Sequence, residues 1–412
     1  MKKYFVFCLV LVLLCLLVAL FCSCSGKETV TLYVYNWGEY ISDGSEDSLD
    51  VNAAFEEWYE KTYHKRVKVN YSTYSSNEDM YAKLSSGAAN YDIVVPSDYM
   101  IARMIDEGLL RPLNMENIPN AAYIDYSAMF GNGLPYYDPT YAYSVPYTYG
   151  TVGIIYNKTM VDEEDLGTWD IMWNEKYTGN VLQFNNSRDA FATALFKLGY
   201  SVNTEDEAQW REALALLMEQ KPIVQGYVMD EIFNKMENGS AAIAPYYAGD
   251  FFTMYDDNPD LGFSYPREGT NVFVDAMCIP TSSKNPEIAE LYINFMLSRE
   301  AAIANAEYMC YASPNSLVVN DPEYRAYMSD IHPDALEILY GTTGLKLEFY
   351  QNLPEERLML LNSLWEDLKI ESPINTAIIV MAGAVLGGCV GIGVFFAVRA
   401  RKRRRIVSTL WQ

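Results

Sequence analysis

The sequence predicts an α/β fold of two lobes, between which the chain crosses more than once. Segments that alternate as strands do are followed repeatedly by segments in which apolar side chains recur at helical spacing. No low-complexity linker or internal repeat interrupts the body of the chain. Alternation of this kind favours a mostly parallel sheet covered by helices, and the ligands of such sheets gather at the carboxyl ends of strands.

The first part of the body alternates most clearly. Leu32 and Val34 alternate with tyrosines as in a strand, and Val51, Phe55 and Tyr59 recur on one face of a helix. The elements expected after these are strands at 67–73 and 91–97 and helices at 77–84 and 99–107.

The second part begins near residues 143–158. Strands are expected within 238–250, where a polar strand end follows, and at 271–280, where Asp275 falls in the middle of an apolar run. A buried carboxylate is costly unless it is paired, so Asp275 calls for a partner or a ligand. Helices are expected at 191–198, 207–219, 287–297, 299–307 and 354–369.

Both ends of the chain are typical of membrane targeting. Residues 1–23 combine two lysines, a long apolar run and small residues, which predicts a secretory signal peptide. Cys24 resembles the cysteine of a bacterial lipobox, which predicts lipidation of Cys24 and a linker over 24–30; an uncleaved N-terminal anchor is the alternative. Residues 374–398 carry no charge and suit a transmembrane helix, and the basic residues of 399–412 predict a cytoplasmic tail. The body is therefore expected on the extracytoplasmic face of the cell membrane.

The charge of the chain is strongly acidic and unevenly distributed. The formal net charge is −24, and all 54 Asp and Glu lie between residues 25 and 373. An acidic body repels nucleic acid and attracts small cations, so no nucleic-acid partner is expected. The two histidines, His64 and His332, lie far apart, which argues against a histidine-based catalytic or zinc site. After export, Cys278 and Cys310 could form a disulfide or remain as two buried thiols.

Aromatic and acidic residues gather where the expected strands end. Aromatic faces attract an alkylammonium group by about 0.5–2 kcal/mol each. A carboxylate pairs with such a group through charge-assisted hydrogen bonds. The clusters therefore predict a binding site for an organic ammonium ion, and Gly38 lets the backbone turn in the first of them and leaves room for the ligand. They are NWGEY (36–40), PSDY (96–99), SRD (187–189), YYAGD (246–250), FVD (273–275) and CYASPN (310–315).

Several of these residues have alternative interpretations. Trp37 alone could be a packing residue, and Asp275 could form a structural ion pair with Arg188 or another base. Tyr246 and Tyr247 could be ligands of ferric iron, although the acids around them suit an amine as well or better. No nucleophile motif or phosphate-binding loop is found, so the chain is not expected to be an enzyme or to hold a cofactor.

The clusters and the segments around them resemble the bacterial spermidine/putrescine-binding proteins, the extracytoplasmic solute receptors of polyamine ABC importers. Matching segments run in the family's order from about Thr31 to Leu368 and include LYVYNWGEY, YDIVVPSDYM, SVPYTYGTVGI and VDAMCIPTSSKN. The resemblance implies a two-lobed, type II-like periplasmic-binding-protein fold that closes over its ligand. On this basis we assign lobe 1 to 31–145 and 276–320, and lobe 2 to 146–275 and 321–372.

The resemblance also implies which residues contact the ligand. They are the aromatic box Trp37, Tyr40, Tyr99, Tyr247, Phe273 and Tyr311, the acids Asp189, Asp250 and Asp275 with Glu39 nearby, and the polar Ser97 and Gln351. Four positions depart from the family pattern. Tyr247 and Phe273 stand where tryptophan is common, Gly38 replaces a hydroxyl residue, and Asn186 stands at a common aspartate. Smaller rings weaken the cation–π attraction and Asn186 removes a charge, so both putrescine and spermidine stay open as the preferred ligand.

These features predict a membrane-tethered receptor that binds putrescine or spermidine and delivers it to the permease subunits and ATPase of an ABC importer. A membrane-anchored signalling subunit is the alternative, because the same lobes with a span and a basic tail could report polyamine to a membrane partner. Neither prediction involves a cofactor.

Overall fold

The computed structural model describes residues 29–45, 47–130, 135–341 and 344–370. The predicted signal peptide 1–23, Cys24, the predicted span 374–398 and the predicted tail 399–412 lie outside these residues. Among the residues that are described, no helix is long and apolar enough to cross a membrane. The chain divides into two compact units, Met1–Glu355 and Glu356–Gln412, and the described sheet lies wholly in the first.

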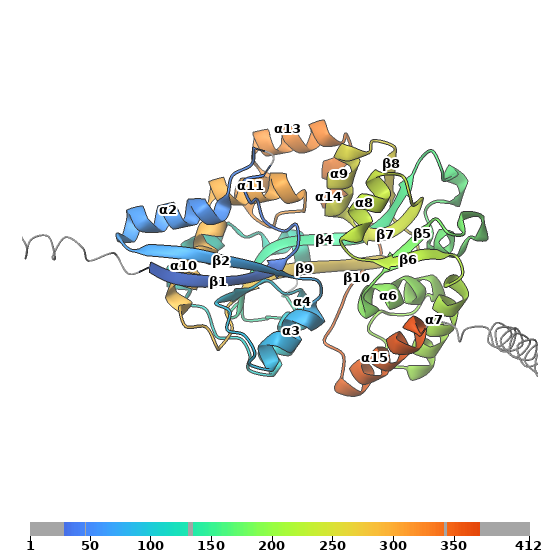
Figure 1. Ribbon diagram of the computed structural model, residues 1–412, viewed down its shortest axis with the longest axis horizontal. Coiled ribbons are helices and arrows are strands. Elements are labelled where there is room, and N and C mark those ends of the chain that lie inside the picture. The colour runs from blue at the N-terminus through green and yellow to red at the C-terminus, as the bar shows by residue number, and fades with distance from the viewer. Residues whose placement is uncertain (1–28, 46, 131–134, 342–343, 371–412) are drawn as a thin grey trace, which may run out of the picture. The chain divides into compact units, whose positions relative to one another are not determined.

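A mixed β-sheet forms the centre of the first unit (Figure 1). Its strand order is β2-β1-β3-β9-β4-β7-β5-β6, with β10 beside β9 and β8 beside β4. The strands are β1 (Thr29–Trp37), β2 (Arg66–Tyr74), β3 (Ile93–Val94), β4 (Ser144–Asn157), β5 (Val181–Phe184), β6 (Val224–Val228), β7 (Ile243–Tyr247), β8 (Leu261–Ser264), β9 (Thr270–Cys278) and β10 (Leu347–Phe349).

Helices cover the two ends of this sheet. We call β1–β3 with their helices the β1 half; these helices are α2 (Val51–Tyr63), α3 (Asn77–Ser85), α4 (Asp98–Asp106), α10 (Pro286–Met296) and α11 (Arg299–Met309). We call β5–β8 with their helices the β5 half; these helices are α6 (Ser187–Leu198), α7 (Glu207–Gln220), α8 (Glu231–Glu237) and α9 (Ala248–Asp257). The remaining α-helices are α5 (Tyr126–Phe130), α12 (Ser316–Val319), α13 (Pro322–Ile331), α14 (Ala335–Tyr340) and α15 (Glu355–Lys369). Single 3₁₀ turns lie at Met115–Asn117, Pro119–Tyr123, Glu163–Asp165, Trp169–Trp173 and Glu175–Tyr177.

Two long central strands join the halves. The first residues of β4, up to Thr151, pair with β9, and the rest of β4 pairs with β7 and β8. Strand β9 returns antiparallel to β4 and meets β3 at Cys278. Two of the predicted lobe boundaries, 145/146 and 275/276, fall within these strands, and the third, 320/321, lies between α12 and α13; all three stay predictions. Because the chain leaves along β4 and comes back along β9, the central pairs are antiparallel, while β1, β2 and β3 and likewise β5, β6 and β7 are parallel. The sheet is therefore mixed rather than mostly parallel.

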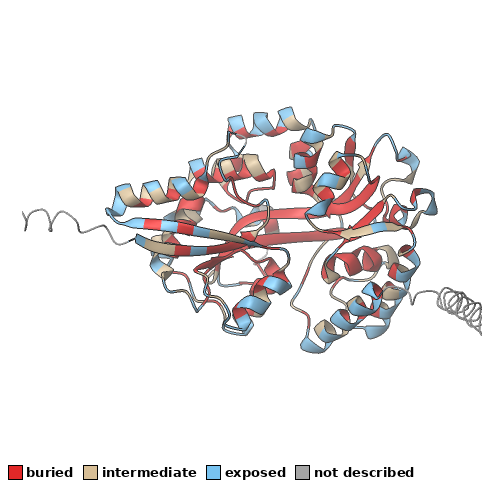
Figure 2. Ribbon diagram, viewed as in Figure 1, coloured by how far each residue is buried: buried red, intermediate tan, exposed pale blue. Residues whose placement is uncertain are grey.

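Burial explains why β4 and β9 hold the centre. Every residue of β9 is buried, and all of β4 except Tyr156 is buried (Figure 2). Strands buried on both faces read as continuous apolar runs, as these two largely do. In the β1 half, Phe55 of α2 packs against Tyr292 and Phe295 of α10, with ring centroids 5.0 and 5.6 Å apart. This aromatic packing holds α2 and α10 together in the β1 half.

Most elements predicted from the sequence are confirmed, with three differences. The strand expected at 91–97 is only Ile93–Val94. Asp250, expected at a strand end, lies in the first turn of α9, because β7 passes into that helix at once. Strand β1 begins at Thr29, inside the predicted linker 24–30. Cys278 and Cys310 are both buried and free, which answers the question that the sequence left open.

Candidate functional site

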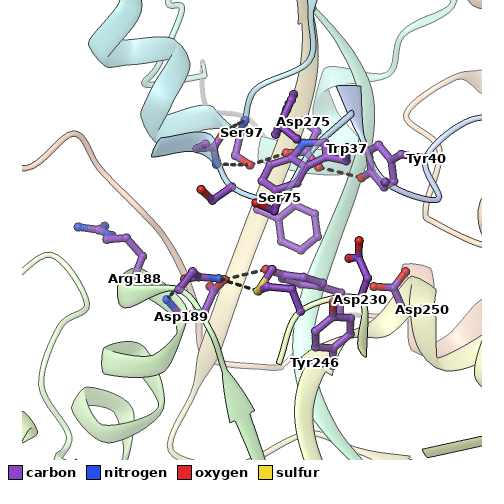
Figure 3. A pocket seen from close by; sticks show the side chains of 18 of the residues that line it. Trp37, Tyr40, Ser75, Ser97, Arg188, Asp189, Asp230, Tyr246, Asp250 and Asp275 are labelled. Atoms are coloured by element: carbon purple, nitrogen blue, oxygen red, sulfur yellow. Dashed lines mark hydrogen bonds between the residues drawn. The ribbon is translucent and has the colours of Figure 1, made fainter. Parts of the chain in front are cut away.

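A cavity lies between the two halves, where β1, β2, β5 and β7 end. Its volume is about 850 Å³, including its open mouth. Aromatic rings and carboxylates form its walls (Figure 3). Among the described residues that line it, Arg188 is the one base. The carboxylates are Glu39, Glu78, Asp189, Asp230, Asp250 and Asp275.

The structure brings thirteen of the fourteen predicted contact residues to this cavity. They are Trp37, Gly38, Glu39, Tyr40, Ser97, Tyr99, Asn186, Asp189, Tyr247, Asp250, Phe273, Asp275 and Tyr311. Gln351 is not among the lining residues and is exposed. Its backbone N–H donates to Asn203 Oδ1 at 2.7 Å, and the preceding Tyr350 lines the cavity in its place. That the thirteen touch a ligand stays a prediction.

Asp275 lies in the middle of β9 and is 4% exposed. Ser97 Oγ donates to its Oδ1 at 2.6 Å, and the Tyr40 hydroxyl donates to its Oδ2 at 2.8 Å. Burial raises the pKa of Asp275 to about 6, although these two hydrogen bonds lower it. The alternative of a structural ion pair with Arg188 is wrong, because the partners of Asp275 are hydroxyl groups. The carboxylate is therefore held in place without being neutralised.

Asp250 occupies the first turn of α9, where a carboxylate is favoured by the helix dipole. The Tyr311 hydroxyl donates to its Oδ2 at 2.9 Å. Burial, together with the smaller effects of the negative charges of Asp230 and Glu39, raises the pKa of Asp250 to about 8, although the hydrogen bond from Tyr311 lowers it. In the empty cavity at neutral pH, this carboxyl is therefore largely protonated.

Asp189 differs from these two carboxylates because its oxygens already have several donors. Asn186 caps α6 by accepting from the Asp189 N–H, and the Asn186 amide donates back to Asp189 Oδ2 at 2.6 Å. The hydroxyls of Tyr247 and Tyr350 donate to the two oxygens at 2.7 and 2.8 Å. A saturated carboxylate has less capacity to receive a further donor. Asn186 thus orders this end of the cavity although it adds no charge.

The aromatic walls come from both halves. Trp37, at the end of β1, donates its indole N–H to the Val95 carbonyl at 2.9 Å, which fixes the ring plane. Tyr311 packs edge-to-face on Tyr40 with ring centroids 5.0 Å apart, and Phe273 packs on Tyr247 at 5.3 Å. Rings held in this way present π faces or hydroxyls without further loss of side-chain entropy on binding.

Arg188 neutralises part of the charge near Asp189. Its guanidinium lies over the rings of Tyr350 and Tyr99, at 4.5 and 5.4 Å from their centroids. Its Nη2 donates to Asn203 Oδ1 at 3.2 Å. Figure 3 shows Arg188 and Asp189 on one side of the cavity, and Asp230 and Asp250 on the other. The cavity therefore has one end with a base and one end without.

Sequence reasoning missed two of the six carboxylates. Glu78 lies in the first turn of α3, after β2, and Asp230 lies between β6 and α8. Both follow the carboxyl end of a strand, so the rule that located the other clusters could have found them. Neither residue belongs to a cluster of aromatic and acidic residues in the sequence, so the pattern that indicated the other carboxylates does not indicate these two.

The ferric-iron alternative receives no support from the tyrosines it requires. Tyr246 is buried, and its ring stacks on Phe184 with the ring centroids 5.5 Å apart. The Tyr247 hydroxyl moreover donates to Asp189. Within the described part of the chain, no group of three or more His, Cys, Asp or Glu is arranged to hold a metal ion.

Comparisons with known proteins agree with this geometry. Residues 53–329 match the model of the family described as bacterial extracellular solute-binding protein. The spermidine/putrescine-binding periplasmic protein of Escherichia coli K12 is 32% identical, over 81% of this chain and 94% of that protein. A putrescine/cadaverine-binding protein of Pseudomonas aeruginosa is 28% identical, over 86% of this chain and 98% of that protein.

A solved structure gives the same answer for the fold. The spermidine/putrescine ABC transporter substrate-binding protein of Streptococcus pneumoniae, determined with calcium and HEPES, is 33% identical with a TM-score of 0.63. The match covers 83% of this chain and 99% of that one. The periplasmic-binding-protein fold expected from the sequence is therefore confirmed. The chain belongs to the bacterial extracellular solute-binding proteins and, among them, to the spermidine/putrescine-binding periplasmic proteins.

Proposed function

We propose that this protein is the extracytoplasmic receptor of a polyamine importer and that it binds putrescine or spermidine in the cavity between its halves. The observation that carries the proposal is the charge of the lining: six carboxylates face one base. An organic polycation is the ligand that such a lining neutralises, because each buried carboxylate is costly until it is paired.

In this proposal the ligand's ammonium groups pair with Asp275 and Asp250. The side-chain hydrogen bonds that these two carboxyl groups accept come from hydroxyl groups. The methylene chain lies against the rings of Trp37, Tyr40 and Phe273. Each ring adds roughly 0.5–2 kcal/mol of cation–π attraction where a charged nitrogen lies over it. Closure of the halves then excludes water, and the chain itself catalyses no reaction.

Delivery to a membrane partner completes the proposal. The receptor would pass its ligand to the permease subunits of an ABC importer driven by their ATPase, and the names of the related proteins support such a partner. Lipidation of Cys24, a span at 374–398 and a cytoplasmic tail at 399–412 would keep the receptor beside that permease. The apolar and basic composition of these segments supports the anchoring.

Calorimetric titration of the purified protein tests the proposal. We expect putrescine and spermidine to bind one per chain with micromolar or lower dissociation constants. The control ligand is 1,4-butanediol, which has the chain length of putrescine without its charges, and we expect it not to bind. Equal binding of the diol and the diamine would show that the carboxylates do not select the ligand, and absence of polyamine binding would overturn the proposal.

A further inference from the structure

Two exposed acidic residues of the cavity lining come from opposite halves of the sheet. Glu39 follows β1 in the β1 half, and Asp230 precedes α8 in the β5 half. Both line the cavity and both are exposed. Asp250 lies more deeply on the same side as Asp230, as Figure 3 shows. The mouth is therefore acidic on both sides of the cleft.

Gly38 allows the two sides to come together. A Cβ atom at Gly38 would lie 2.9 Å from Asp230 Oδ2, closer than such an atom approaches in folded proteins. The backbone of Gly38 is not in the left-handed region, so its conformation would admit other residues. A side chain at position 38 would therefore displace the Asp230 carboxylate from its place beside the Gly38 backbone.

Within the described part of the chain, Asp230 has neither a paired base nor a hydrogen-bond donor. No described residue donates a hydrogen bond to its carboxylate, and Arg188, the one base among the described lining residues, lies at the other side of the cavity. The surrounding protein raises the pKa of Asp230, and the neighbouring Glu231 raises it further. Asp230 in turn raises the pKa of Asp250. A positive group placed near Asp230 and Asp250 would therefore be favoured by both carboxyl groups.

We propose that Asp230 is a specificity-determining residue: when the halves close, it is brought against Gly38 and pairs with an ammonium group of the ligand that lies towards the mouth. This inference rests on the proposed polyamine-binding function and adds to it a residue outside the set that the family resemblance implies. Gly38 serves the same purpose by leaving room for the Asp230 carboxylate. A ligand with a hydroxyl in place of that ammonium group loses this contact, so Asp230 selects for the second positive charge.

The charge of Asp230 is tested through ligand discrimination. The probes are putrescine and 4-amino-1-butanol, which differ by one ammonium group, titrated into the full chain in low salt. In Asp230→Asn the preference for putrescine over the amino alcohol should fall about fivefold, the scale of a partly exposed ion pair. Asp257→Asn is the matched control: it removes one exposed charge from α9 outside the cavity and should keep the full preference.

The contact with Gly38 is tested by a double-mutant cycle. Gly38→Ala should weaken putrescine binding at least fivefold, because its methyl group meets Asp230 in the closed form. In the Asp230→Ala background the same Gly38→Ala change should cost little, since the carboxylate is gone. Equal costs in the two backgrounds would overturn the coupling, as would unchanged discrimination in Asp230→Asn.

The outcomes separate this inference from the function beneath it. A wild-type protein that binds putrescine, together with an Asp230→Asn variant that keeps full discrimination, removes the role of Asp230 and leaves the receptor intact. A wild-type protein that binds neither amine overturns both. Because Asp230 is exposed, its variants should fold, and equal melting temperatures of the empty proteins check this directly.

Discussion

Replacing Asp275 by asparagine should weaken polyamine binding strongly while leaving the empty protein about as stable. Asp275 is 4% exposed and accepts hydrogen bonds from Ser97 and Tyr40 without a neutralising base. A hydrogen bond to a charged group contributes about 1.5–3 kcal/mol. Losing that contribution lowers the affinity between about tenfold and about a hundredfold.

The empty protein should tolerate the change because its hydrogen bonds survive. The asparagine oxygen can accept from one of the two hydroxyls, and the amide can donate to the other, since a hydroxyl both donates and accepts. A buried charge is removed at the same time, so we expect the free energy of unfolding to change by less than about 1 kcal/mol.

Two assays on one preparation decide the role of Asp275. Calorimetry with putrescine measures the affinity, and thermal unfolding without ligand measures the stability, with Asp257→Asn as the control for loss of a distant charge. The reasoning is refuted if the variant unfolds many degrees earlier while its folded fraction binds normally, because Asp275 would then be a structural residue.

Further predictions concern the pH dependence of the site, the charge at position 186 and the anchoring of the chain. Because burial raises the pKa of Asp250 to about 8 and that of Asp275 to about 6, the empty site holds protons that a bound ammonium displaces, so the affinity for putrescine should rise from pH 5.5 to pH 8; a fall over this range would contradict the expectation. For the same reason the empty protein should become less stable as pH rises over this window, which a thermal unfolding series measures. Asn186→Asp places a second carboxylate beside Asp189, so that the acids at this end of the cavity outnumber the one base, Arg188, and the variant should shift its preference from putrescine towards spermidine in a competition assay; an unchanged ratio means that this end does not receive a third nitrogen. For the anchoring proposal, protease added to intact cells should digest residues 25–373 and spare a tag placed after Gln412, and a protected body would contradict it.

Much of the cavity lining could be predicted from the sequence, because the carboxyl ends of parallel strands meet at one edge of a sheet, where ligands bind. Trp37 could be predicted in this way because it ends a clear strand, whereas Asp275 was found because it is a carboxylate inside an apolar run. The short length of β3 could not be predicted, because the residues that flank Ile93–Val94 in the sequence include apolar ones that do not pair as a strand.

Contacts between the two halves could not be predicted from the sequence. The approach of Asp230 to Gly38 depends on how two distant segments are brought together, and no local pattern encodes that distance. The saturation of Asp189 by Tyr247 and Tyr350 is of the same kind, because its donors come from separate parts of the chain. Gln351 is a different case, because the family resemblance gave that position, whereas the side chain that lines the cavity is that of Tyr350; a ligand contact of Gln351 stays a prediction.

A crystal structure of the protein grown with putrescine tests the central claim most directly. The account predicts one putrescine between the two halves, with one nitrogen within about 3.2 Å of a carboxylate oxygen of Asp275 and the other on the Asp250 and Asp230 side. It is contradicted if the diamine lies outside the cavity, or if its nitrogens avoid all of these carboxylates at full occupancy.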